Sequence, residues 1–156
     1  MTDGDEFSRV VGRALHALAD ALGADGAAIM LVDERDRPRA VGGSDEDGRR
    51  LELAQEQTGS GPAIESLARD SGVVVNDLHA ARPFGFPGVA ERALGVRAVL
   101  SVPLRVGDRV IGSLDFYDRA SHEWQPAKIR AGERLAELMV MVLQGLAHKS
   151  PISGQP

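Results

Sequence analysis

Apolar residues at helical spacing open the chain and are followed by two short apolar runs. From Asp5 to Leu22, apolar side chains recur at three- and four-residue intervals and acidic residues occupy the first turn, which predicts an amphipathic helix. The continuous apolar run Ala27–Val32 suits a central strand, and Arg39–Val41 predicts a second strand beyond a polar turn. We expect these two strands to form a meander.

The middle of the chain alternates short helical segments with irregular ones. Ser44 is a suitable N-cap for one helix, and Pro62 suits the first turn of the next. The segment after the following strand contains Pro83 and Pro87 and cannot be regular, and such a long loop with two phenylalanines suggests function. We expect helices at 44–57 and 62–71, a strand at 73–76, an irregular loop at 77–88 and a short helix at 89–94.

Two apolar segments around Gly107-Asp108 form the clearest local pattern and predict a β-hairpin. If Val106 faces Arg109, the register pairs Leu104 with Ile111, Val102 with Ser113, and Leu100 with Asp115. Both faces of this hairpin are largely apolar, so we expect both to be covered. Buried polar groups need partners, so we expect a ligand or ordered water on the face that carries Ser113 and Asp115.

The last predicted helix, which begins at Pro126, has an apolar stripe wider than one core-facing side requires. Surplus apolar surface favours a partner helix, most economically from a second copy of the chain. We therefore expect one domain over residues 1–148, a flexible tail over 149–156, and a homodimer interface that contains Phe7, Val11, Leu138, Val142 and Leu146.

Composition and charge narrow the function classes. The chain has 156 residues, enough for one domain, with 43% hydrophobic and 26% charged residues, which is ordinary for a globular protein. The net charge of -5 and the absence of a basic stripe argue against a nucleic-acid partner. The longest apolar run, 138–143, is too short to span a bilayer, and the acidic start is unlike a signal peptide. We expect a cytoplasmic protein without membrane contact.

The residues that usually carry catalysis are missing or scattered. The sequence contains no cysteine, which removes disulfides, thiolate nucleophiles and cysteine-ligated metals. The four histidines never pair at helical spacing, so we expect no metal site. No serine occupies a Gly-x-Ser-x-Gly elbow, and Gly59-Ser60-Gly61 lacks the spacing and lysine of a phosphate-binding loop. We expect a protein that is not an enzyme.

Four motifs follow one another along the chain: Gly59-Ser60-Gly61-Pro62, Val75-Asn76-Asp77-Leu78, the segment 94–104 and the segment 111–117. In this order they resemble the GAF domain, specifically those of actinobacterial regulators that often carry an RNA-binding ANTAR domain. The resemblance implies an α+β, profilin-like or PAS-like fold with a six-stranded antiparallel sheet. The first and last helices would cover one face, and a ligand pocket with short helices and a loop would occupy the other.

The resemblance also places the pocket. Carried over by position, it would be lined by Ile64, Asp77, Phe84, Phe86, Leu100, Val102, Ser113 and Asp115. Asp77 is equally interpretable as a cap of its own loop, and the two phenylalanines as core anchors.

The resemblance implies a sensory, regulatory domain of signal transduction that binds a small molecule and dimerises through its terminal helices. The alternative is a scaffold without a ligand that serves dimerisation or partner binding. Covalent bilin attachment and methionine-sulfoxide reduction by GAF proteins need cysteine, so both are excluded, and the signature of cyclic-nucleotide GAF domains is not recognisable. The cofactor therefore stays unassigned.

Haem is a minor alternative. Gly85-Phe86-Pro87 resembles a motif of haem-binding GAF sensors, but Gly88-Val89-Ala90 stands where those proteins place a proximal histidine, and His79 is the only nearby substitute. No output domain follows the last helix, so we expect either a stand-alone domain with a partner protein or a fragment of a longer chain.

Overall fold

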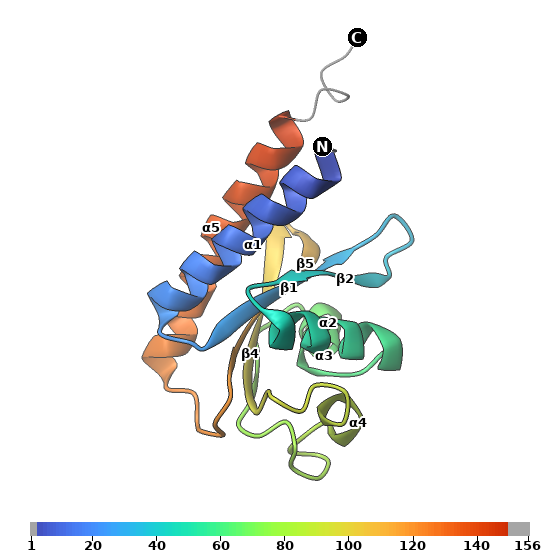
Figure 1. The fold of residues 1–156 in the computed structure, drawn as a ribbon, viewed down its shortest axis with the longest axis vertical. Coiled ribbons are helices and arrows are strands. Elements are labelled where there is room, and N and C mark those ends of the chain that lie inside the picture. Colours follow the sequence, from blue (N-terminus) through green and yellow to red (C-terminus); the bar gives the residue numbers. More distant parts are fainter. Residues whose placement is uncertain (1–2, 150–156) are drawn as a thin grey trace.

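Five helices and five strands make up the fold of this computed structural model, which describes residues 3–149 (Figure 1). The elements are α1 (Asp3–Leu22), β1 (Gly26–Val32), β2 (Pro38–Gly43), α2 (Glu46–Thr58), α3 (Pro62–Arg69), β3 (Val73–Val75), α4 (Pro87–Ala90), β4 (Ala98–Val106), β5 (Arg109–Asp118) and α5 (Pro126–Lys149). Their order is the predicted one, although α4 begins at Pro87 and not at Val89. Of the predicted tail, residues 150–156 lie outside the described part.

The strands form one antiparallel sheet in the order β2-β1-β5-β4-β3. The α+β architecture expected from the sequence is confirmed, with five strands in the described residues where the resemblance implied six. The long hairpin of β4 and β5 lies at the centre, and the three-residue β3 lies at one edge. None of the helices in residues 3–149 is long and apolar enough to cross a membrane.

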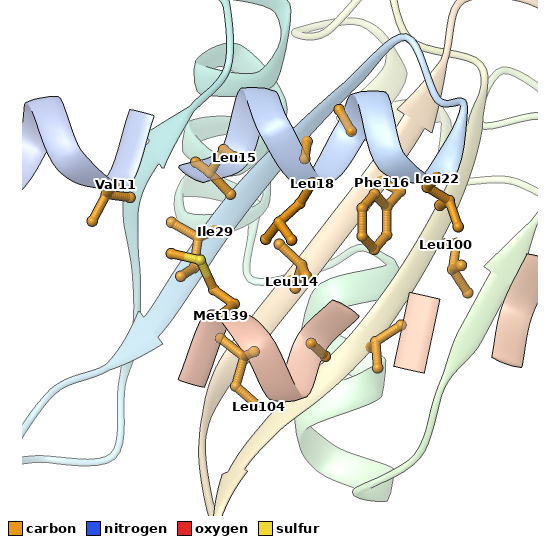
Figure 2. Packing of buried hydrophobic residues seen from close by; sticks show 14 of the residues in the cluster. Val11, Leu15, Leu18, Leu22, Ile29, Leu100, Leu104, Leu114, Phe116 and Met139 are labelled. Carbon is orange, nitrogen blue, oxygen red and sulfur yellow. The ribbon is translucent and has the colours of Figure 1, made fainter. Parts of the chain in front are cut away.

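The larger core lies between the sheet and the antiparallel helices α1 and α5, which run side by side (Figure 1). Leu15 and Leu18 of α1 and Met139 of α5 point toward Ile29 and Leu114 of the central strands (Figure 2). The helical spacing of the α1 residues places them on one face, and burial of each such side chain stabilises the fold by about 1.5–3 kcal/mol. Both terminal helices therefore cover the same face of the sheet, as expected.

A β-bulge in the hairpin changes the predicted register. Val106 pairs with Arg109 as predicted, and Gly107 takes a positive φ of 61° at the turn. Arg105 then pairs with Val110 and Leu104 with Gly112, so Ile111 is an extra residue. From this point the predicted pairing is wrong by one residue, because Ile111 is inserted. Since side chains alternate along a strand, the shift moves each predicted partner to the opposite face.

The other face of the sheet carries α2 and α3. The prediction of Ser44 as the N-cap of α2 is wrong: the cap is Asp45, whose Oδ1 accepts from the Gly48 N–H at 3.0 Å. Ser44 instead accepts from the backbone of Ala27 in β1 at 3.0 Å. A smaller core beneath α2 and α4 contains Leu51, Ala54, Val75, Leu78, Phe86, Val89, Ala90, Ala93, Val96, Val99 and Tyr117.

Candidate functional site

Ser113 and Asp115 of β5 lie fully buried on the face of the sheet that α2 and α3 cover. Ser113 donates to Asp115 Oδ1 at 2.7 Å. Across the hairpin, Asp115 pairs with Ser101 and Ser113 pairs with Pro103. Since cross-strand partners share a face, two serines and an aspartate meet among apolar neighbours.

Glu52 of α2 reaches the same place and was not expected there. Its carboxyl group is fully buried and lies within hydrogen-bonding reach of the Asp115 carboxyl group. Gln55, one helical turn further on, donates to Glu52 Oε1 at 2.7 Å. The site therefore joins α2 to β5 through two carboxyl groups, flanked by neutral donors.

This geometry favours a proton on Glu52. Burial raises the pKa of Glu52 well above its usual range, and the neighbouring Asp115 raises it further, while the Gln55 hydrogen bond lowers it. Ionised carboxylates only accept, so Glu52 Oε2 and Asp115 Oδ2 have no donor between them unless one carries a proton. A proton on Glu52 Oε2 can be donated to Asp115 Oδ2 and satisfies both atoms.

Ser101 of β4 carries a further buried oxygen of this site. Its Oγ is without a hydrogen-bond partner, although the residue is fully buried. A buried hydroxyl without a partner costs about 1–3 kcal/mol, so such atoms in a folded protein require an explanation. We define the polar cluster as Glu52, Gln55, Ser101, Ser113 and Asp115.

The helix α3 and its connection to α2 cover part of this face. Gln55 Oε1 accepts from the Ala63 N–H at 2.8 Å, so one side chain ties α3 to Glu52. Gly61 has a φ of 130°, and a Cβ there would lie 2.4 Å from Gln55 Oε1, so the turn between the helices needs glycine. Ile64 of α3 is half-buried, and its predicted place in the cover of the pocket stays a prediction.

A second group of polar residues lies where α2 begins. Tyr117 of β5 donates to Asp45, and Arg119 donates to Asp45 Oδ2 at 2.6 Å and to Asp47 Oδ2 at 2.9 Å. Burial raises the pKa of Asp45, but the hydrogen bonds from Tyr117, Gly48 and Arg119 outweigh burial, so the net pKa is lowered. This fully bonded group anchors α2 to the sheet.

Leu100 and Val102 do not line this site. The one-residue shift turns both toward α1 and α5, where they belong to the larger core, and Figure 2 shows Leu100 among the core side chains. Val102 also lines a groove of about 510 Å³ together with Ala136 and Val140 of α5. Their prediction as pocket residues is wrong because the bulge reverses their face.

The predicted pocket residues of the loop 77–88 lie outside the polar cluster. Asp77 accepts from its own turn, at the His79 N–H, and from Arg97 at 3.1 Å on both oxygens. Its alternative interpretation as a loop cap is confirmed, while ligand contact by Asp77 stays untested. Phe86 is buried in the smaller core, as the anchor interpretation had it, and Phe84 is 79% exposed, so it is neither an anchor nor a wall.

His79, the substitute ligand in the haem alternative, is half-buried, and its Nε2 has no hydrogen-bond partner. Among residues 3–149, no group of three or more His, Asp or Glu side chains could hold a metal ion.

The surface predicted for dimerisation is partly exposed. Leu138 is 49% exposed and Met141, on the same helix, is 64% exposed, while Phe7, Val142 and Leu146 are half-buried. Val11 is 1% exposed inside the larger core, so its assignment to an interface is wrong. The reason is that α1 turns Val11 toward the sheet, close to Gly42 of β2.

Glu52, Gln55 and Ser101 are the site residues that the sequence reasoning missed. The usable signal was the helical spacing of Gly48, Leu51, Glu52 and Gln55, which places two polar side chains on the face that buries a leucine. Ser101 was assigned to the opposite face through the predicted register.

Comparisons with known proteins relate this sequence and fold to one family. The sequence profile of the GAF domain matches residues 5–144. The structure is similar to a domain of a protein described as a two-component sensor histidine kinase from Sinorhizobium meliloti 1021, with a TM-score of 0.71 and 20% identity over 94% of this chain and 96% of that chain. A search of curated proteins finds no sequence match.

Two other similar structures differ in what they do. One is the free methionine-R-sulfoxide reductase from Neisseria meningitidis, in complex with its substrate, with a TM-score of 0.65 and 22% identity over 85% of this chain and 75% of that chain. The other is the GAF domain of the Acinetobacter phosphoenolpyruvate-protein phosphotransferase, with a TM-score of 0.62 and 18% identity over 97% and 88%. At these identities the likeness shows the fold, which signalling proteins and enzymes share.

Proposed function

Because this chain belongs to the GAF domain family, whose fold is typical of sensory and signalling domains, we propose that it is a regulatory domain that binds a small molecule. The observation that carries the proposal is the polar cluster, in which a fully buried carboxyl pair and an unpartnered serine hydroxyl lie on an otherwise apolar sheet face. Unpartnered buried polar atoms are where a ligand gains most from hydrogen bonding.

The proposed response passes through α3. A ligand that engages Glu52 competes with the Gln55 hydrogen bond, and Gln55 also holds the backbone of Ala63 at the start of α3. The ligand shifts the equilibrium between positions of α3 only by as much as its affinity for them differs. Site occupancy and the position of α3 are thereby coupled.

We also propose that the domain dimerises through α1 and α5. Leu138 and Met141 form an exposed apolar surface on α5, and contact with a second copy would remove it from water. The partner proteins of the proposed function are a second copy and an output protein, in the cytoplasm. The proposal includes no catalytic step, since the chain has no cysteine for methionine-sulfoxide reduction.

A thermal-shift screen of metabolites and nucleotides tests the ligand-binding function. We expect at least one compound to raise the melting temperature of the wild type and to have a much smaller effect on an Asp115→Asn variant. An Asp108→Asn variant is the matched control, since Asp108 lies exposed in the turn between β4 and β5. A screen in which no compound stabilises the wild type contradicts the proposal and favours the ligand-free scaffold.

A further inference from the structure

Apart from the proton that Glu52 can share with Asp115, three fully buried oxygen atoms of the polar cluster have no hydrogen-bond partner: Glu52 Oε2, Asp115 Oδ2 and Ser101 Oγ. Ser101 and Asp115 are cross-strand partners, so their side chains leave the same face of the sheet next to each other. Glu52 approaches the Asp115 carboxyl group from α2. The three oxygens therefore converge around Asp115.

The hydrogen bonds that this carboxyl pair does receive come from neutral side chains. Gln55 donates to Glu52 at 2.7 Å, and Ser113 donates to Asp115 at 2.7 Å. These bonds leave one oxygen of each carboxyl group unused, and neither donor supplies a positive charge. Once the proton that Glu52 shares with Asp115 has left, both carboxylate oxygens only accept, and a serine hydroxyl accepts as readily as it donates, so all three atoms can accept a hydrogen bond.

We propose that the ligand of this site carries a small organic cation with three or more N–H donors, a primary ammonium or a guanidinium group, held by Glu52, Asp115 and Ser101. This inference rests on the proposed ligand-binding function and names its ligand class. A primary ammonium that displaces this proton to solvent supplies three donors and no acceptor, which matches the three oxygens one to one. An anion would meet like charge, and an apolar group would leave the three oxygens unpartnered.

Access to the site requires movement of its cover, because all five residues of the polar cluster are fully buried. Two hydrogen bonds hold the ends of α3: Gln55 Oε1 accepts from the Ala63 N–H at 2.8 Å, and Ser66 Oγ donates to the Ser71 carbonyl at 2.8 Å. Only the first involves the polar cluster. A cation at Glu52 Oε2 shares the carboxylate with the Gln55 amide and so weakens the bond of the side chain that holds the start of α3.

Titration of the intact, nitrogen-15-labelled protein with methylguanidinium chloride, followed by NMR, tests the proposal. Methylurea is the matched neutral probe, since it has nearly the same shape and lacks the charge, and sodium chloride keeps the ionic strength constant. We expect saturable shifts at the amides of Ser101, Ser113 and Asp115 with methylguanidinium at millimolar concentration, and binding of methylurea weaker by about tenfold or more.

Variants identify the residues that hold the cation. We expect Glu52→Gln and Asp115→Asn to weaken methylguanidinium binding by about tenfold or more, and Ser101→Ala to weaken it less. Glu65→Gln, on α3 and paired with Arg69, is the control and should bind like the wild type. The amide and carboxyl groups have the same shape, and the dispersion of each NMR spectrum shows whether the variant is folded.

Three outcomes overturn the proposal. They are equal binding of methylurea and methylguanidinium, unchanged binding in both carboxyl variants, and no shift with the cation at the cluster, as an ordered water alone would give. A neutral or anionic metabolite that binds at the same amides would overturn the cation assignment while the ligand-binding function stands. Failure of every compound in the thermal-shift screen overturns both.

Discussion

Asp45, the N-cap of α2, and Glu52, within that helix, have pKa values shifted in opposite directions. Asp45 receives hydrogen bonds from Tyr117, Gly48 and Arg119, so its net pKa is lowered and it stays ionised. Glu52 receives only the Gln55 amide and faces Asp115, so burial and the neighbouring carboxyl raise its pKa. Depth of burial and the number of donors together decide which carboxyl keeps its charge, since the Asp45 side chain is 37% exposed and Glu52 is fully buried.

Replacement of Glu52 by glutamine should change the pH dependence of stability. The raised pKa means that the folded state holds a proton that the unfolded state loses above about pH 4.3. Its stabilising effect is full below that pH and falls as the pH rises, by up to about 1.4 kcal/mol per unit. Glu52→Gln keeps the donor and removes the titration, so it should gain on the wild type as the pH rises above about 5.

Urea unfolding at several pH values measures this difference, with Glu65→Gln as the control. The free energy of unfolding of the control should run parallel to the wild type. If the Glu52→Gln curve also runs parallel, Glu52 is ionised in the folded protein and the carboxyl pair does not share a proton.

At the scale of elements, the hairpin shows which features the local sequence predicts and which it does not. Its turn and first pairs follow from the Gly-Asp sequence, since Gly107 adopts the positive φ that such a turn needs. The bulge at Ile111 does not follow, because it depends on the neighbouring strand. A Cβ at Gly112 would lie 2.2 Å from the Met30 carbonyl oxygen of β1, so this position must be glycine. The bulge is the reason that the prediction of Leu100 and Val102 as pocket residues is wrong.

Glu52 was missed for a related reason. A glutamate on a helix is usually solvated, and its helical spacing with Leu51 indicates the buried face only once the sheet beneath α2 is known. By contrast, the helices and strands themselves were predictable, because the spacing of apolar residues such as Leu15, Leu18 and Leu22 records which face is buried.

Alanine at Gly112 tests the close approach of β5 to β1. We expect Gly112→Ala to lower the free energy of unfolding by about 1–3 kcal/mol, since backbone atoms must separate to admit the Cβ. Gly12→Ala is the matched control: Gly12 lies within α1 with no atom near its absent Cβ, so alanine should stabilise the helix by about 0.5–1 kcal/mol. Urea unfolding measures both, and a neutral Gly112→Ala would contradict the register.

On the scale of the whole molecule, the two faces of the sheet have different proposed roles. The face under α1 and α5 is filled by the larger core, and α5 leaves Leu138 and Met141 exposed beyond it. The face under α2 and α3 contains the polar cluster. A ligand on one face can influence a dimer on the other only through the sheet and its helices.

The dimer proposal predicts that one charged substitution on α5 lowers the mass of the protein in solution from dimer to monomer. Met141→Glu should convert a dimer into a monomer in sedimentation at micromolar concentration, because it introduces a charge into the apolar contact. Gln144→Glu adds the same charge at another exposed position of α5 and should stay dimeric if it lies outside the contact. A monomeric wild type would contradict the proposal outright.

Native mass spectrometry tests the central claim, small-molecule binding by the polar cluster, most directly. Wild type and Asp115→Asn are incubated with the filtered small-molecule extract of the expression host, desalted and measured. The account predicts an added small mass on the wild type and its loss from the variant. A wild type that stays bare, or an added mass that Asp115→Asn retains in full, would contradict it.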